Sequence, residues 1–224
     1  MVNERSIVIT GASSGLGECL SKSFSKSYDV INISRSISST PHNIISNFRD
    51  LKDLKQKLKS NKFKHELCIL NAGSMGEIEF ASEITDKDFL DTLKINVVAN
   101  KIIIDWSILN GCKHFIGISS GAAKKNYDGW LNYCVSKSAF RSMFLQYQKD
   151  LPKLRFKLIS PGILSTEMNK KIKAQDISLY PEMKKFHETK ASPPHKSSEL
   201  IYKRHNDYFK SEKLEIDLRD DVDW

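Results

Sequence analysis

The chain has 224 residues, of which 40% are hydrophobic and 28% charged, and its formal net charge is +8. This length and composition predict one domain, residues 1–224, with a buried core, and they exclude a disordered chain. The four cysteines form no CxxC pair and no residues have the spacing of metal ligands, so we expect reduced thiols and no metal. No apolar run approaches the roughly 18 residues of a membrane span, and no secretory signal is recognised, which favours a cytoplasmic protein.

Basic residues are in largest excess between positions 151 and 213. A basic segment can attract nucleic acid, an anionic membrane or an anionic substrate, but lysines that solvate helix faces are the commoner cause. The lysines of residues 51–64 accompany three leucines and Phe63 at the spacing of an amphipathic helix, without an aromatic platform on which bases could stack. We therefore expect no nucleic-acid partner and no membrane partner.

Short β-branched runs alternate along the chain with longer helical patterns, which is typical of βαβ units. The predicted strands are Ser6–Thr10, Val30–Ser34, Leu67–Leu70, His114–Ser119 and Phe156–Ser160, with a last edge strand at Leu214–Leu218. The predicted helices are Gly15–Ser27, Leu51–Lys59, Asp86–Leu109 and Trp130–Asp150. The pattern predicts an α/β fold, a doubly wound parallel sheet with helices on both faces.

Two further signals concern the third predicted helix and the stretch after the last buried strand. Thr85 and Asp88 resemble a capping box at the start of that helix, and Gly111 is suited to end it. Residues 169–194 are too long for an ordinary connection, so we interpret them as a substrate-binding loop or lid.

The first predicted strand leads into a glycine-containing turn and then into a helix with an apolar face. Glycines there let the backbone approach a pyrophosphate, and the helix N-terminus offers free N–H groups and the positive end of its dipole. The junction predicts a dinucleotide site in a Rossmann-like domain. The candidate cofactor residues of this turn are Gly11, Ser13, Ser14, Gly15, Leu16 and Gly17.

The end of the second predicted strand indicates which dinucleotide is bound. NAD sites usually carry an acidic residue there, which binds the adenosine ribose hydroxyls. Ser34 takes its place in this chain, and Arg35 follows with a guanidinium suited to bind a phosphate. We therefore expect NADP(H) rather than NAD(H), with Ser34 and Ser36 as further phosphate donors. The alternative is a surface arginine without a role.

Tyr133 and Lys137 stand four residues apart in a predicted helix, so their side chains share one face. A free tyrosine has a pKa near ~10, and a cation at about 4 Å would lower it; we expect Lys137 to make Tyr133 a general acid/base. Ser120 follows a predicted strand, where its hydroxyl can bind a substrate carbonyl oxygen. Asn96 lies inside a predicted helix, an unfavourable place for an amide without a structural or water-holding role.

In order and spacing, these motifs resemble the single-domain branch of the short-chain dehydrogenase/reductase family, from Thr10 to about Glu199. Thr10–Gly17 is similar to the family's TGxxxGxG turn. The resemblance implies hydride transfer between a nicotinamide and a carbonyl or alcohol carbon. The residues that match the family's catalytic tetrad are Asn96, Ser120, Tyr133 and Lys137. In the family the Lys lowers the pKa of the Tyr and binds the nicotinamide ribose, and the Asn helps to hold a water of the proton relay.

The same resemblance implies more cofactor contacts. Asp50-Leu51 corresponds to an adenine-contacting position, residues 71–73 to the family's NAG motif, and residues 161–166 to its PGxxxT segment at the nicotinamide carboxamide. The implied cofactor residues are Asp50, Leu51, Asn71, Ala72, Gly73, Tyr133, Lys137, Pro161, Gly162, Ile163 and Thr166. Two departures stand out: Leu70 replaces the first Asn of the usual NNAG, and the glycine turn lacks the basic residue of many NADP-binding members, so the NADP preference rests mainly on Arg35.

We expect reduction of a small ketone or aldehyde with NADPH, or oxidation of the corresponding alcohol. A nucleotide-sugar epimerase or dehydratase is less favoured, because such members carry an extra C-terminal domain and only 58 residues follow Thr166. A non-catalytic NADP(H)-sensing regulator is disfavoured by the intact tetrad. Lysines of the loop, with Lys124 and Lys125, suggest an anionic group on the substrate, although a solvated lid helix is the alternative that we favour. The resemblance also implies a homodimer or homotetramer.

Overall fold

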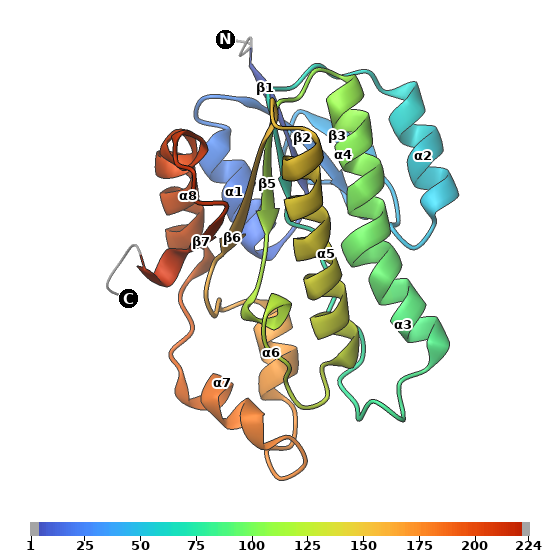
Figure 1. Ribbon diagram of the computed structural model, residues 1–224, viewed down its shortest axis with the longest axis vertical. Coiled ribbons are helices and arrows are strands. Elements are labelled where there is room, and N and C mark those ends of the chain that lie inside the picture. Colours follow the sequence, from blue (N-terminus) through green and yellow to red (C-terminus); the bar gives the residue numbers. More distant parts are fainter. Residues whose placement is uncertain (1–4, 221–224) are drawn as a thin grey trace.

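The computed structural model describes residues 5–220, whose strands form one seven-stranded, wholly parallel sheet (Figure 1). The strands lie in the order β3-β2-β1-β4-β5-β6-β7. Their bounds are β1 Ser6–Thr10, β2 Asp29–Ser34, β3 His42–Ile45, β4 Leu67–Leu70, β5 His114–Ile118, β6 Arg155–Ser160 and β7 Glu215–Asp217. The predicted Rossmann-like, doubly wound parallel sheet is confirmed.

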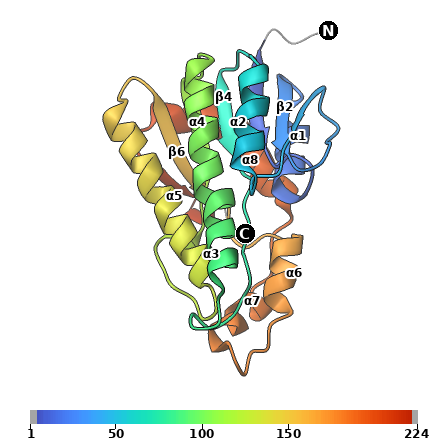
Figure 2. The ribbon, with the colours of Figure 1, turned by 90° about the vertical axis from the view of Figure 1, so that its right-hand side faces the viewer.

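Helices cover both faces of this sheet: α1 and α8 lie on one face, and α2, α4 and α5 on the other (Figure 2). The α-helices are α1 Gly15–Phe24, α2 Leu51–Ser60, α3 Asp86–Leu93, α4 Ala99–Leu109, α5 Leu131–Asp150, α6 Glu167–Lys173, α7 Lys184–Glu188 and α8 Pro194–Lys210. A π-helical turn, Lys94–Val98, joins α3 to α4, and short 3₁₀ turns occupy Gly121–Ala123, Pro181–Met183 and Leu218–Asp220. Among residues 5–220, no helix combines the length and the apolar character needed to cross a membrane.

Each face of the sheet has its own apolar core. Leu20 and Phe24 of α1 pack with Ile201 of α8 on one face. On the other face, Phe140 and Phe144 of α5 lie against β5. Burying such side chains stabilises the fold by about 1.5–3 kcal/mol each. The two cores hold the carboxyl ends of the strands, where the candidate site lies, in fixed relative positions.

The structure confirms most predicted elements within one to three residues at their ends. The predicted cap by Thr85 is confirmed, since Thr85 Oγ1 accepts a hydrogen bond from Asp88 N at 3.2 Å, and Gly111 adopts a φ of +87°. The reciprocal half of the capping box is not formed, because the Asp88 carboxylate accepts from Glu77 N and Asn132 Nδ2. Two predictions need correction. Strand β3 was not predicted, because its four residues contain a single buried side chain, Ile44. The predicted helix Asp86–Leu109 is interrupted by the π-helical turn.

The strand order reverses next to β1, whose neighbours are β2 on one side and β4 on the other. In open parallel sheets, ligands bind at the carboxyl ends of the strands beside such a reversal. The glycine turn follows β1, and Asn71 follows β4. The topology therefore places both segments at the expected crevice.

Candidate active site

The glycine turn connects β1 directly to the first turn of α1. Gly11 and Gly15 have φ values of +71° and +56°, a region that other residues rarely adopt. A Cβ on Gly17 would lie only 2.1 Å from the carbonyl oxygen of Gly11. Ser14 makes no side-chain cap hydrogen bond with the described residues, so the first N–H groups of α1 are available to a ligand. These features fit a bound pyrophosphate.

Asn71 fastens this turn to the neighbouring strand. Its Nδ2 donates to the carbonyl of Thr10 at 3.1 Å, and its backbone N–H donates to Thr10 Oγ1 at 2.9 Å. Two residues further on, a Cβ on Gly73 would lie 3.4 Å from Asn96 Oδ1 and 3.8 Å from Lys137 Nζ. The NAG segment therefore lies between the glycine turn and two members of the tetrad.

Asn32 is a buried amide in the middle of β2 that the sequence analysis missed. Its Oδ1 accepts from Ala12 N in the glycine turn at 3.1 Å. Its Nδ2 donates to Asn43 Oδ1 at 2.8 Å, Ser34 Oγ at 3.0 Å and Ser36 O at 3.1 Å. An asparagine inside an otherwise apolar strand was the available signal, because a buried amide needs partners. Asn32 thereby ties the glycine turn to the loop that follows β2.

That loop carries the residues expected to bind the 2′-phosphate. Ser34 is buried, and its hydroxyl donates to Ser36 O at 2.6 Å. Arg35 is exposed and makes no hydrogen bond or ion pair with any other described residue. The guanidinium is therefore free to bind an anion, whereas the Ser34 hydroxyl is already engaged within the loop.

Asp50 and Leu51 lie at the start of α2. The Asp50 carboxylate caps the helix, accepting from Lys52 N at 3.1 Å and Asp53 N at 3.0 Å. Leu51 packs on the apolar core beneath α2. The structure thus assigns both residues a structural role, and their contact with adenine stays a prediction.

The tetrad residues come from three different elements and meet at the carboxyl end of β5. Tyr133 and Lys137 lie in the first two turns of α5, and only 7% and 6% of their surfaces are exposed. Ser120 lies two residues after the end of β5, and its Oγ accepts from Ala122 N at 3.2 Å. Lys137 Nζ donates to the carbonyl of Ile118, the last residue of β5, at 2.8 Å.

Asn96 lies in the π-helical turn and is almost fully buried. Its Oδ1 accepts from Ser74 N at 2.7 Å, and its Nδ2 donates to Ser74 O at 2.7 Å and to Ser136 Oγ at 2.8 Å. Ser136 Oγ in turn donates to the carbonyl of Tyr133 at 2.9 Å. The side chain of Asn96 thus connects the segment after β4 to the helix that carries Tyr133 and Lys137.

The pKa of Tyr133 differs from the sequence-based expectation. Burial raises it to about 12, although a hydrogen bond with Ser120 acts in the opposite direction. Burial also lowers the pKa of Lys137 to about 8. The expected lowering by Lys137 is therefore not found, because its ammonium donates to Ile118 O and lies 5.6 Å from the Tyr133 ring centroid. Desolvation of the phenol is the larger effect.

The PG segment follows β6 and lies beside the glycine turn. Gly162 has a φ of +81°, and the Cγ2 of Thr166 lies 3.6 Å from the position of a Cβ on Gly15. Ile163 packs against the apolar cluster to which Tyr133 belongs. Segments about 150 residues apart in sequence therefore border one crevice, as a dinucleotide that spans both would require.

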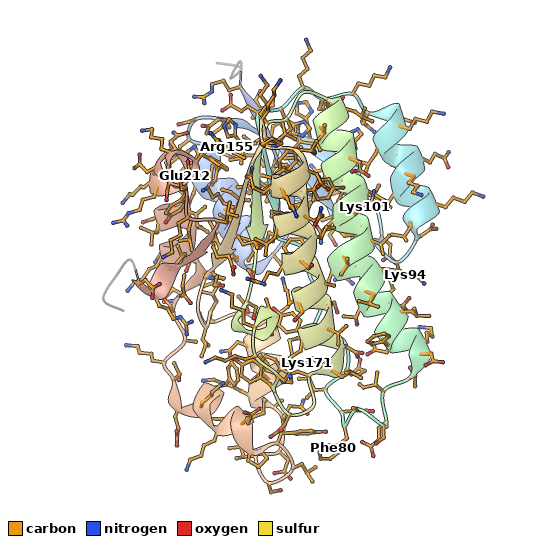
Figure 3. The ribbon with its side chains drawn as sticks, viewed as in Figure 1. Phe80, Lys94, Lys101, Arg155, Lys171 and Glu212 are labelled. Carbon is orange, nitrogen blue, oxygen red and sulfur yellow. The ribbon has the colours of Figure 1, made fainter. Side chains whose placement is uncertain are left out.

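Residues 169–194, the predicted lid, contain the end of α6, the 3₁₀ turn Pro181–Met183 and α7, so this stretch is more regular than predicted. Its role as a lid stays a prediction. An aromatic cluster joins the lid to the tetrad: the Trp130 ring lies 5.8 Å from that of Tyr133 and 5.0 Å from that of Phe186. The buried members of this cluster are Met75, Ile78, Ala122, Trp130, Tyr133, Cys134, Ile172, Tyr180, Met183 and Phe186. Figure 3 shows Phe80 at the outer end of the lid, where its ring lies 5.2 Å from that of Tyr180.

Several lid lysines are engaged by the protein itself. Lys171, labelled in Figure 3, donates to Gly76 O at 2.8 Å and pairs with Glu77 at 3.1 Å. Lys185 Nζ lies 3.9 Å from the ring centroid of Tyr127. Two more ion pairs lie within single helices, Lys170–Glu167 and Lys184–Glu188. These contacts favour the alternative of a solvated lid helix over an anion-binding one.

A cleft of about 330 Å³ opens beside Ser120. Its walls come from the segment after β5 and from β7 with the 3₁₀ turn that follows it. The charges in the walls are mixed, and Lys124 forms an ion pair with Glu215 at 2.6 Å. Of the tetrad, Ser120 lines this cleft, whereas Asn96, Tyr133 and Lys137 do not.

The chain is similar to known proteins of one family. The model of the short chain dehydrogenase family matches residues 5–177. A benzil reductase ((S)-benzoin forming) from Bacillus subtilis is 26% identical over 216 residues, which cover 87% of this chain and 88% of that protein.

Solved structures show the same fold. A short chain dehydrogenase/reductase from Saccharomyces cerevisiae superposes with a TM-score of 0.82 at 17% identity, over 95% of each chain. The closed form of a serine dehydrogenase complexed with NADP⁺ gives a TM-score of 0.79 at 21% identity, over 94% of this chain and 93% of the other. With a family match over most of its length and this fold, the chain belongs to the short chain dehydrogenase family of oxidoreductases.

Proposed function

We propose that this protein reduces a small ketone or aldehyde with NADPH, with Tyr133 as the general acid. The observation that carries the proposal is that Tyr133, Ser120 and Lys137 lie together at the carboxyl end of β5. Ser120 also lines a cleft that opens to solvent. The substrate carbonyl gains a hydride at carbon and a proton at oxygen. A bound NADPH supplies the hydride.

The protein's own residues supply position and the proton. The hydroxyls of Ser120 and Tyr133 hold the carbonyl oxygen from one side. As negative charge develops on that oxygen, both hydroxyls stabilise it and Tyr133 transfers its proton. Lys137 contributes a positive charge in a buried environment, where charges interact strongly. Asn96 connects the helix of Tyr133 to the segment after β4 and thereby positions the group.

NADP(H) fits the residues on the other side of the crevice. The uncapped α1 N-terminus and the glycines would hold the pyrophosphate, and Arg35 the 2′-phosphate. The NADP⁺ in the serine dehydrogenase structure is consistent with this proposal. Asp50 and Leu51 would border the adenine, and Ile163 and Thr166 the nicotinamide.

Arg35→Ala is expected to raise the Kd for NADPH about 10- to 100-fold and to change the Kd for NADH less than about twofold. The reason is that a hydrogen bond between charged groups contributes about 1.5–3 kcal/mol, and only NADPH carries the 2′-phosphate. Fluorescence titration with each cofactor measures both constants. Arg155→Ala is the matched control, because Arg155 lies at the amino end of β6, the opposite end of the parallel sheet (Figure 3). An equal loss of both cofactors would contradict the NADP preference.

The pH dependence of reduction should follow Lys137. Burial lowers its pKa to about 8, so its positive charge is present below that pH and lost above it, while Tyr133, with a pKa raised to about 12, keeps its proton. We expect kcat for reduction to be level near pH 6–7 and to fall as the pH rises through about 8. Lys137→Met should lower kcat and abolish this descending limb. A kcat that stays level to pH 10 in the native enzyme would exclude this role for Lys137.

The substrate class follows from the aromatic cluster and the relatives. Trp130 and Phe186 border Tyr133 with large apolar surfaces, and two matched bacterial proteins are benzil reductases. We infer a ketone with a bulky apolar or aromatic substituent. NADPH consumption with benzil, acetophenone and acetone tests this inference, with the aromatic ketones expected to give the higher kcat/KM. If the protein bound NADPH but did not oxidise it in the presence of any of these carbonyl compounds, the result would instead support the alternative of a cofactor-sensing regulator.

A further inference from the structure

Asn100 is a buried asparagine near the start of α4, four residues after Asn96. The π-helical turn changes the backbone pairing just before it. Ala99 N donates to the carbonyl of Lys94, five residues back, instead of to that of Ile95, four residues back. The side chain of Asn100 donates to two carbonyls within this turn, since its Nδ2 lies 2.8 Å from Asn96 O and 3.4 Å from Ile95 O.

This type of hydrogen bond is usual at the end of a helix. Asn61 makes the same contact to the carbonyl four residues back at the end of α2, and Asn110 does so at the end of α4, each at 2.8 Å. Carbonyls at helix ends lack N–H partners, so an amide there stabilises them. Asn100 makes the contact between α3 and α4, where Lys94 marks the start of the turn in Figure 3. The side chain thus satisfies backbone groups at an interruption that would otherwise be unfavourable.

The carbonyl that Asn100 binds belongs to the residue whose side chain organises the tetrad. Asn96 reaches Ser74 with both side-chain atoms and Ser136 with Nδ2. Each residue in an α-helix is rotated about 100° from the one before it. If the π-helical turn changed to α-helical pairing, which takes one residue fewer per turn, the Asn96 side chain would therefore rotate away from Ser74 and Ser136.

We infer that Asn100 is a positioning residue for the proposed reduction, and that it acts by holding the π-helical turn in the register that points Asn96 at Ser74 and Ser136. The Asn100 side chain donates to the backbone of Asn96 and makes no hydrogen bond with Tyr133 or Lys137. Its Oδ1 is buried without a partner among residues 5–220, so the amide is retained for its donor. The inference rests on the proposed function for its kinetic readout only.

Asn100→Ala and Asn100→Leu both remove the donor, and the leucine also preserves most of the side-chain volume. For each variant we expect kcat to fall about 10- to 100-fold, because small displacements of catalytic groups have effects of this size. KM and the Kd for NADPH should stay within about twofold of the native values. Asn110→Ala is the matched control, since it removes the same contact at the other end of α4. We expect its kcat to be unchanged.

A double-mutant cycle with Asn96→Ala tests whether Asn100 acts through Asn96. If it does, adding Asn100→Leu to Asn96→Ala lowers kcat by less than about twofold, because the same interaction is already lost. A double variant whose kcat loss is the product of the two single losses would overturn the inference. So would single variants with a lower thermal midpoint and an unchanged kcat, since that pattern shows a structural role alone.

Amide hydrogen exchange gives a readout that does not depend on activity. In Asn100→Leu, amide exchange at residues 94–100 should become at least about tenfold faster, or the protection pattern of these residues should become that of a continuous α-helix. In the control Asn110→Ala, amide exchange at residues 94–100 should not change. Altered exchange in a protein that reduces no ketone would refute the proposed function and leave the holding role of Asn100 standing. If residues 94–100 of Asn100→Leu exchanged at the same rates and with the same pattern as in the native protein, the role of Asn100 would be refuted whether or not the enzyme is active.

Discussion

Tyr133→Phe is expected to lower kcat for ketone reduction about 1,000-fold while leaving the Kd for NADPH within about twofold. Proton transfer by a positioned side chain contributes roughly 10²- to 10⁴-fold to a rate, and phenylalanine has no proton to give. The ring itself stays, so its edge-on contact with Trp130 and its burial in the aromatic cluster are preserved. Single-turnover rates with a ketone that the native enzyme reduces, together with NADPH fluorescence titration, measure the two effects separately.

Tyr147→Phe provides the control for this experiment. Tyr147 lies on the same helix, α5, and its hydroxyl donates to Asp105 on α4, away from the tetrad. Its replacement should leave kcat within about twofold of the native value. If Tyr133→Phe kept more than a tenth of the native kcat, the proton would come from another group and the proposed mechanism would be wrong.

Gly17→Ala should abolish detectable NADPH binding and also destabilise the fold by about 3 kcal/mol or more. The new Cβ would lie 2.1 Å from Gly11 O and 2.5 Å from Asn71 Nδ2, and the backbone carbonyl of Gly11 cannot relax as easily as a flexible side chain. Overpacking typically destabilises by about 1–3 kcal/mol, and a contact this short belongs at or above that range. The α1 N-terminus would move away from the turn and with it the N–H groups that the pyrophosphate needs.

Gly111→Ala separates the cofactor effect from general destabilisation. Gly111 has a φ of +87°, and a Cβ there would meet no described atom within 4 Å. Alanine in this conformation should destabilise by about 1–2 kcal/mol without changing the Kd for NADPH. Titration and thermal unfolding of both variants are the measurements. A Gly17→Ala protein that bound NADPH as well as Gly111→Ala would exclude the glycine turn as the pyrophosphate site.

The features predicted correctly from the sequence depend on short stretches of chain. The turn after β1 needs glycines because of local backbone angles and one close approach, and both are visible as residue types. Thr85 caps the start of α3, and Gly111 follows the end of α4. Both features depend on contacts within a few residues. Tyr133 and Lys137 share a helix face because their spacing is four residues. The position of Arg35 directly after β2 follows from the same local reasoning.

The errors concern features that depend on distant contacts. Strand β3 is held by pairing with β2 and by a polar network around Asn32 and Asn43, none of which leaves a hydrophobic pattern. The π-helical turn follows a sequence that would suit an uninterrupted helix, and buried contacts of Asn96 with Ser74 and Ser136 accompany it. Lid helices α6 and α7 are short, and their apolar residues find partners only in the aromatic cluster.

The pKa of Tyr133 also depends on distant contacts that the local sequence does not contain. Spacing alone places a lysine near the phenol and predicts a lowered value. The structure buries both groups and directs the ammonium to Ile118 O, so that desolvation raises the pKa of the phenol. The depth of burial is set by α5, β5 and the lid together, which no local pattern contains.

The amino-acid sequence by itself determined the parallel α/β fold, the glycine turn and the order of the tetrad residues, because each depends on steric limits and periodicities within a few turns of chain. The tertiary structure decided which lysines are already paired, which way Asn96 points and how strongly Tyr133 holds its proton. Those properties depend on distances between segments that lie far apart in the chain, and packing fixes such distances only once both faces of the sheet are covered.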